Sequence, residues 1–269
     1  MAPSRKKRPP KRRVAHQSKS PAANALSSES SKQNPTKQRS VTIDALRGLA
    51  IVLMIVDHVA SNWFSVPIAI DTIRFETRLA MPLFAILLGY FLPLDGGFRL
   101  QRLAEVVAAS VAVNLLYFPK HDEFEILASL LIASIIGTAS RSAAPAMLGL
   151  IFLYQTDPLV RWFDYQLSIV LPIVAIGATL RRYGVAASWV AASFLLAITI
   201  SGKWIYPSDT HRFLVWASLP ALLMIVMARR WPAIQPAKVG WLGLDRIGRF
   251  PLSIYVAHYY LIYLVAFAM

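Results

Sequence analysis

The sequence predicts an all-α, polytopic integral membrane protein of about nine transmembrane helices. The first observation is composition: of 269 residues, 56% are hydrophobic and only 16% are charged, whereas soluble domains carry nearer a quarter charged residues. The second is a series of apolar runs, continuing from residue 41 to the last residues, that resemble membrane-spanning helices. The third is the distribution of Lys and Arg, which predicts a cytoplasmic N-terminus.

Residues 1–40 predict a disordered, basic, cytoplasmic tail. They contain eleven Lys or Arg and one acidic residue, so most of the net charge of +14 belongs to the tail. The segment has too few apolar residues to form a folded core. Nucleic-acid binding and attraction to anionic lipid are possible functions. Because no aromatic residue is present to stack on bases, we favour a solvated arm that fixes topology, and we expect no nucleic-acid partner.

Residues 41–269 predict one transmembrane domain. Tryptophans near several of the expected helix ends suit the headgroup layer. Starting from a cytoplasmic N-terminus, the cytoplasmic loops and helix ends carry eleven Lys or Arg and the opposite side carries six. The C-terminus is then expected outside. The fifth helix is short enough to be re-entrant. The expected helices are 41–63, 78–93, 100–118, 124–140, 145–156, 165–180, 185–202, 211–228 and 245–268.

The first of these helices contains the main candidate site. Arg47 and His58 are eleven residues apart, so an α-helix places them on one stripe, about 16 Å apart along its axis. Ionisable groups at membrane depth are costly and usually mark function, and histidine can move a proton near neutral pH. Asp57 could raise the basicity of His58 or contact a neighbouring helix.

Each of these residues also has a structural interpretation. Arg47 could be a snorkelling anchor at the cytoplasmic end of the helix. His58 could bond a neighbouring backbone carbonyl. We favour function for His58, because it lies beside Asp57 and in phase with Arg47.

These residues also carry a family resemblance. Asp44-Ala-Leu-Arg-Gly-Leu-Ala, followed by Asp57-His58, resembles the first helix of the membrane acyltransferase superfamily. That superfamily includes the acyltransferase-3 proteins, the heparan-α-glucosaminide N-acetyltransferase-like proteins and the TraX pilin-acetylating family. The run Arg78-Leu-Ala-Met-Pro-Leu-Phe resembles TraX more specifically. The last expected helix, with Gly248-Arg249 and His258, resembles the last helix that is common in the superfamily.

The resemblance implies a membrane-embedded acyltransferase that moves an acetyl group from cytoplasmic acetyl-CoA to an acceptor such as a saccharide, a lipid or a pilin-like protein terminus. By this resemblance His58 is the essential residue, as a general base or an acylated nucleophile, with Asp57 beside it. Arg47 holds a CoA phosphate or polarises the thioester oxygen, and Arg249 is a second cofactor-binding candidate.

Three further residues form a second tier. Arg249 and His258 repeat the basic-then-histidine pattern of the first helix, and core packing is the alternative for His258. Tyr255 lies on the same last helix. Arg78 is near a non-cytoplasmic helix end, where snorkelling is the competing interpretation. No metal site is expected, because neither buried histidine has a second ligand three or four residues away.

A different class of function also fits the sequence. His58 and His258 could be relay groups of a proton-coupled transporter or channel without enzymatic activity, although no inverted repeat is visible. A membrane tether acting through the basic tail is a third hypothesis. The preferred prediction is an inner-membrane, multi-pass enzyme whose partners are the bilayer, acyl-CoA and an unidentified acceptor.

Overall fold

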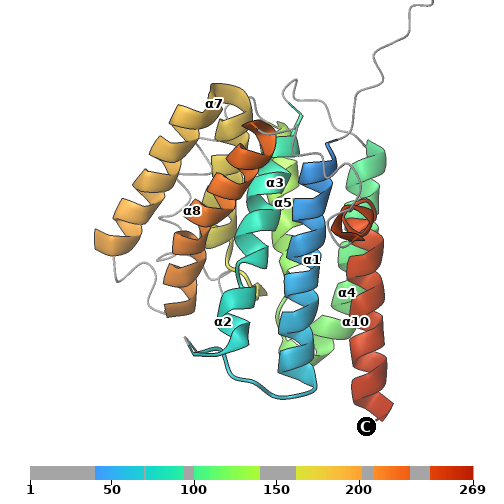
Figure 1. Cartoon of the computed structure of the whole chain (residues 1–269). Coiled ribbons are helices and arrows are strands. Elements are labelled where there is room, and N and C mark those ends of the chain that lie inside the picture. The colour runs from blue at the N-terminus through green and yellow to red at the C-terminus, as the bar shows by residue number, and fades with distance from the viewer. Residues whose placement is uncertain are drawn as a thin grey trace, which may run out of the picture. The chain divides into compact units, whose positions relative to one another are not determined.

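The described part of the chain is built from helices that pack around α1 (Figure 1). A computed structural model describes residues 40–69, 71–93, 100–139, 162–201, 209–230 and 243–268. The basic tail and the expected helix 145–156 lie outside these residues. The helices are α1 (Val41–Asn62), α2 (Ile73–Thr77), α3 (Ala80–Phe91), α4 (Leu100–His121), α5 (Ile126–Ala139), α7 (Leu167–Ser201), α8 (Asp209–Arg230), α9 (Leu244–Ile247) and α10 (Pro251–Ala268).

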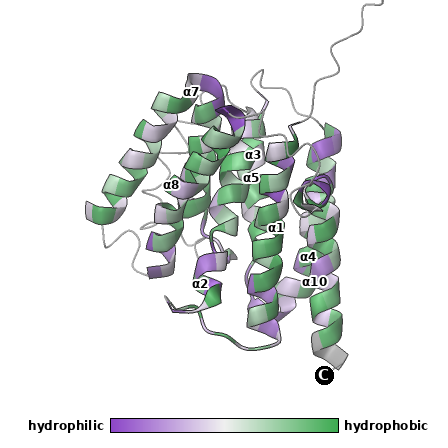
Figure 2. Cartoon of the chain, in the orientation of Figure 1, coloured by the Kyte–Doolittle hydropathy of each residue, from purple (hydrophilic) through white to green (hydrophobic). Residues whose placement is uncertain are grey.

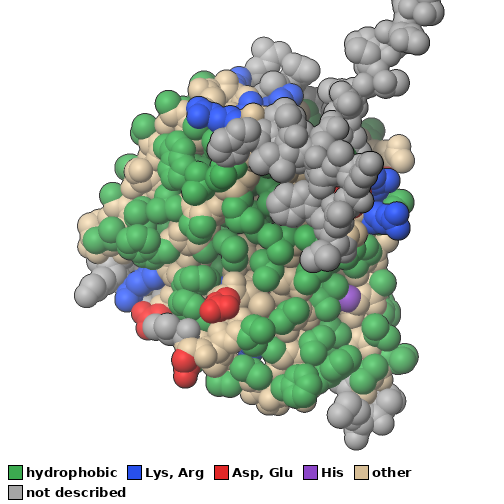
Figure 3. All heavy atoms as spheres, in the orientation of Figure 1, with side chains coloured by type: hydrophobic (Ala, Val, Ile, Leu, Met, Phe, Trp, Pro, Cys, Tyr) green, Lys and Arg blue, Asp and Glu red, His purple; other side chains and the backbone are tan. Residues whose placement is uncertain are grey.

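The helical class and the membrane character agree with the sequence. Within the described residues, α4, α7 and α8 are long and apolar enough to cross a bilayer. Apolar residues run along the outer faces of the helices (Figure 2). Apolar side chains also cover most of the described face in Figure 3, whereas Lys and Arg lie at its upper edge, at its right edge and low on the left, and Asp and Glu lie low on it. This distribution fits a chain whose middle lies in lipid.

A glycine divides α7 into two helical segments. Gly184 has a φ of 88° inside the run Leu167–Ser201, a conformation that side chains with a Cβ rarely adopt. The chain turns there, and the two segments run in opposite directions (Figure 1). The two separate helices expected at 165–180 and 185–202 are therefore present. The short helix α2, directly before α3, was not predicted.

The prediction of one continuous last helix over 245–268 is wrong. The chain forms the short helix α9, continues through turn residues at Gly248–Phe250 and begins α10 at Pro251. Proline lacks a backbone N–H and has a fixed φ, so it is suited to the first position of a helix and unfavourable inside one. Arg249 therefore lies before α10, and the predicted repeat of the basic-then-histidine pattern within one helix does not exist.

The helices α1 and α10 run parallel, and α9, directly before α10, packs its backbone closely against the start of α1. A Cβ on Gly48 would lie 2.0 Å from the carbonyl oxygen of Leu244, and one on Gly248 would lie 1.7 Å from that of Asp44. Farther along, Trp63 Nε1 donates to the carbonyl of Ile262 at 3.5 Å. These contacts fix the register of α1 against α10.

We expect Gly48→Ala to destabilise the protein by about 1–3 kcal/mol, because the new methyl group would overlap the backbone of α9 and not a movable side chain. Thermal unfolding in detergent, followed by tryptophan fluorescence, measures this. Ser61→Ala, which lies on the same helix with its side chain partly buried, is the control. Equal melting temperatures for wild type and Gly48→Ala would show that α9 can move aside.

Candidate functional site

A cavity of about 260 Å³ runs along α1 and is bordered by side chains of α3, α4, α5 and α10. Both Arg47 and His58 line it, as their common stripe predicted. Their separation along the helix is about 16 Å, so they border different ends of the same space. Most of the wall between them is apolar, including Met54, Leu87 and Leu130.

His58 makes its shortest side-chain contact with His258. Nδ1 of His58 lies 2.8 Å from Nε2 of His258. The two rings are within 5° of parallel and their centroids are 5.1 Å apart. Because the nitrogens are so much closer than the centroids, the rings meet edge to edge, and one nitrogen must donate a proton to the other. His258 is buried, with 7% of its surface exposed.

The second nitrogen of each ring has a different partner. Nδ1 of His258 lies 3.3 Å from the carbonyl oxygen of Ile254, one turn earlier in α10. Nε2 of His58 lies 3.5 Å from the hydroxyl of Tyr259, which is long for a hydrogen bond. His58 is among the residues that line the cavity, whereas its two ring partners, His258 and Tyr259, are not.

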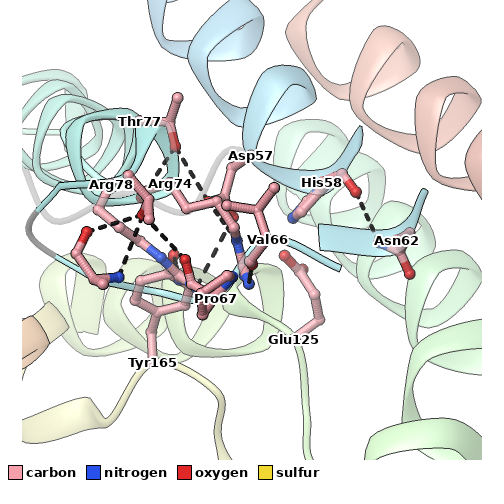
Figure 4. A network of polar contacts seen from close by, with 12 residues as sticks. Asp57, His58, Asn62, Val66, Pro67, Arg74, Thr77, Arg78, Glu125 and Tyr165 are labelled. Carbon is pink, nitrogen blue, oxygen red and sulfur yellow. Dashed lines mark hydrogen bonds and ion pairs between the residues drawn. The ribbon is translucent and has the colours of Figure 1, made fainter. Parts of the chain in front are cut away.

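Asp57 faces the segment that contains α2 and the start of α3. Its Oδ1 accepts from Arg74 Nε at 3.3 Å and from Thr77 Oγ1 at 3.1 Å, and its Oδ2 lies 3.9 Å from Arg78 Nη2. Figure 4 shows this cluster beside His58. No hydrogen bond or ion pair joins Asp57 to His58 in the described structure. Of the two roles considered for Asp57, contact with a neighbouring helix is the one observed.

Arg78 lies in the wall of the cavity near His58. It is buried, with 8% of its surface exposed, and its Nη1 donates to the hydroxyl of Tyr165. Its buried Nε has no hydrogen-bond partner within the described part of the protein. A buried guanidinium N–H without an acceptor is costly, so this donor would bind an oxygen atom of a bound molecule if a movement of the cavity wall brought the two together.

Glu125 and Tyr255 form a second buried pair in the cavity wall. Glu125 is 1% exposed and Tyr255 is 4% exposed. The tyrosine hydroxyl donates to Oε1 of the carboxylate, and the backbone N–H of Leu127 donates to Oε2 at 2.9 Å. Asn114 of α4 accepts from the backbone N–H of Glu125 at 2.9 Å. In Figure 4 the carboxylate of Glu125 points toward His58.

The opposite end of the cavity is basic. Nη1 of Arg47 donates to Asp44 at 2.8 Å, and the guanidinium lies 4.3 Å from the ring centroid of Phe91. Arg102, from the first turn of α4, also borders the cavity. This end can accommodate an anionic group, because two guanidinium groups border one space.

The two ends of the cavity therefore differ in charge. The segment leading to α5 carries Glu123 and Glu125. Burial raises the pKa of the Glu123 carboxyl, and the nearby carboxylates of Asp164 and Asp122 raise it further. Glu123 itself does not line the cavity, and Glu125 lines it together with the cation of Arg78, so a phosphate is attracted most strongly near Arg47 and Arg102.

Arg249 does not border the cavity. Its Nη2 donates to Asp245 at 3.2 Å, and half of its side chain is exposed. Arg249 was predicted to bind the cofactor, but the structure does not place it beside Arg47 and His58. It lies in the turn between α9 and α10, outside both helices. Within the described residues, no three His, Asp or Glu side chains are grouped closely enough to hold a metal ion.

The site contains residues that sequence reasoning did not select. Sequence alone did not single out Glu125, which lies near a helix end, or Arg102, which contributes to the cytoplasmic positive charge. Tyr165 and Tyr259 carried no signal in the sequence, because an isolated tyrosine in an apolar run reads as an ordinary core residue.

Comparison with known proteins adds nothing to this geometry, since no family model, curated protein or solved structure matches the chain.

Proposed function

We propose that this protein is a membrane-embedded acyltransferase that moves an acetyl group from acetyl-CoA to an acceptor hydroxyl or amine. The observation that carries the proposal is the single cavity bordered by Arg47 at one end and His58 at the other. An acyl-CoA donor needs a basic group to bind its phosphates, a largely apolar passage for its long pantetheine arm and a proton acceptor at the reacting end. This cavity places Arg47 and Arg102, a largely apolar wall and His58 around one space.

His58 is the general base of the proposed reaction. Nε2 takes the proton of the acceptor as its oxygen or nitrogen attacks the thioester carbonyl carbon. The carbon–sulfur bond then breaks, and the CoA thiolate leaves with the proton that His58 returns. An acylated His58 is the alternative route, in which Nε2 itself attacks the thioester and the acceptor attacks the acyl-imidazole.

Arg78 stabilises the oxygen that becomes negative during the attack. Its buried Nε–H lacks an acceptor in the described structure, and such a preorganised donor acts most strongly in a site without water. Arg47 is too far from His58 for this role, with about 16 Å between them along α1. Of the two roles considered for Arg47, we therefore propose phosphate binding.

We expect Arg47→Ala to raise the KM for acetyl-CoA by roughly 10- to 100-fold, which is the range of a lost charged hydrogen bond. Arg47→Lys should recover only part of this, because a point charge cannot reproduce the two-pronged contact of a guanidinium with phosphate. The rate of CoA release from acetyl-CoA, in the presence of a membrane extract as acceptor source, provides the measurement.

The matched control is Arg230→Ala, which removes an exposed arginine at the end of α8 that does not border the cavity. An unchanged KM in Arg47→Ala would show that Arg47 is only an anchor. Mass spectrometry of glycans, lipids and membrane proteins, with and without the gene, tests the proposed function more broadly through the loss of an acetyl increment.

The His58–His258 contact also favours a second candidate, a proton-coupled transporter or channel. Two histidines 2.8 Å apart can pass a proton. However, Nδ1 of His258 faces a backbone carbonyl, which cannot accept a proton and pass it on. Because the carbonyl cannot pass the proton on, this contact is evidence against a proton relay that continues through α10. Proton flux into liposomes containing the purified protein distinguishes the two functions.

We further propose nine membrane spans, with the N-terminus in the cytoplasm of a cell whose inner membrane holds the protein. The parallel course of α1 and α10 supports an odd number of spans. Reporter fusions at residue 40 and at the C-terminal residue test this, and the two reporters should lie on opposite sides of the membrane.

A further inference from the structure

The contact between His58 and His258 has a direction that the other contacts of the two rings determine. A backbone carbonyl can only accept, so Nδ1 of His258 must carry the proton in its 3.3 Å contact with Ile254. In the neutral ring, Nε2 of His258 is then unprotonated and can only accept. The nitrogen opposite it, Nδ1 of His58, must therefore donate across the 2.8 Å gap.

The same argument determines the state of the second ring nitrogen of His58. With its proton on Nδ1, a neutral His58 has an unprotonated Nε2. The only described protein donor near that nitrogen in the hydrogen-bond network is the hydroxyl of Tyr259, at 3.5 Å. A contact of that length is weak and can give way to an acceptor substrate that donates a shorter bond.

We propose that His258 is a positioning residue that holds His58 in the Nδ1–H tautomer, so that Nε2 is available as the base. The tautomer itself does not depend on the enzymatic function, whereas its catalytic consequence rests on the acyltransfer proposed above. His258 takes the place that a carboxylate holds in a Ser–His–Asp triad. It does so without a second charge in the membrane, where a carboxylate would be costly.

The arrangement also stabilises the charged intermediate. When Nε2 of His58 takes a proton, the ring becomes an imidazolium, and its Nδ1–H bond to His258 becomes a stronger, charge-assisted bond. The Ile254 carbonyl keeps His258 from rotating out of line, because it is fixed in the backbone of the same helix. Loss of His258 would remove both the choice of tautomer and this stabilisation.

The first test is the nitrogen-15 spectrum of the purified, histidine-labelled protein without substrate, with the His58 signal assigned by comparison with His58→Asn. We expect a protonated Nδ1 and an unprotonated Nε2 on neutral His58. A proton on Nε2 in the wild type would overturn the proposal. This measurement needs no substitution at His258, so it remains decisive if variants there fail to fold.

The second test compares His258→Leu with His258→Gln. Leucine offers no acceptor, whereas the glutamine amide can place an oxygen close to the position of Nε2. In His258→Leu we expect His58 to lose its preference for the Nδ1–H tautomer. We also expect kcat for CoA release from acetyl-CoA to fall roughly 100-fold with little change in KM. His258→Gln should recover most of both.

The two measurements separate the possible failures. A wild-type kcat in a folded His258→Leu variant, or an unchanged tautomer in it, would contradict the positioning role. If the tautomer shifts as expected but no acetyl-CoA is consumed by the wild type under any acceptor tried, the positioning of His58 stands and the proposed enzymatic function fails.

Discussion

Replacing His58 with Ala is expected to abolish acyl transfer, lowering kcat by roughly 10²–10⁴-fold, which is the contribution typical of a general base. His58→Asn should lose as much activity, although its amide N–H can still donate to His258. That comparison separates the base on Nε2 from the hydrogen bond on Nδ1. Acetyl-CoA consumption by the purified variants, with a membrane extract as acceptor source, is the measurement.

Both variants should fold, since His58 contributes a proton-competent group that costs stability to keep in a membrane. His121→Ala is the matched control, because it removes a ring at the end of α4 that contacts Tyr263 and does not border the cavity. Turnover equal to that of the wild type in a folded His58→Ala variant would remove the central residue of the enzyme. Proton flux in liposomes would then be the next measurement.

Replacing Asp57 with Ala is expected to lower the free energy of unfolding by about 3–5 kcal/mol. The substitution would leave the buried cation of Arg78 without its carboxylate, and removing one partner of a buried ion pair carries a cost of this size. Arg74 and Thr77 would lose the same acceptor. Asp57→Asn should fall between Ala and the wild type, because an amide oxygen can still accept from Thr77. Thermal unfolding in detergent checks both.

The control for this comparison is Asp209→Ala, which breaks the pair of Asp209 with Arg212 at the start of α8. There the carboxylate is 76% exposed, and an exposed pair contributes at most about 1 kcal/mol. A similar loss from both substitutions would mean that burial does not strengthen the Asp57 cluster. A folded Asp57→Ala with wild-type stability and no activity would instead favour a catalytic role for Asp57.

The sequence predicted those parts of the site that depend on the geometry of one helix. Arg47 and His58 border one cavity because an eleven-residue spacing repeats closely on an α-helix. Most helix bounds could be predicted within a few residues, since apolar runs and the turn residues between them are local signals. The pairing of His58 with His258 was suggested only through similar depth, and the contact itself depends on how α1 and α10 pack.

What sequence reasoning missed depends on contacts between distant segments. Sequence alone could not decide whether Asp57 contacts His58 or a neighbouring helix. The residue pattern of α1 does not show that the segment containing Arg74 and Arg78 folds back against it. Glu125 gives no signal in the sequence, because a carboxylate near a helix end usually reaches solvent. Its burial follows from the inward course of the segment before α5, where Asn114 accepts from its backbone N–H.

The parallel docking of α1 and α10 also has a consequence for how the protein is made. His58 belongs to the first described helix to leave the ribosome and His258 to the last. The ring contact can form only after α10 has been inserted and α9, directly before it, has packed against Gly48. Until then His58 has no fixed tautomer from this contact. The proposed chemistry therefore stays inactive in a partly synthesised chain until the insertion of α10 completes the site.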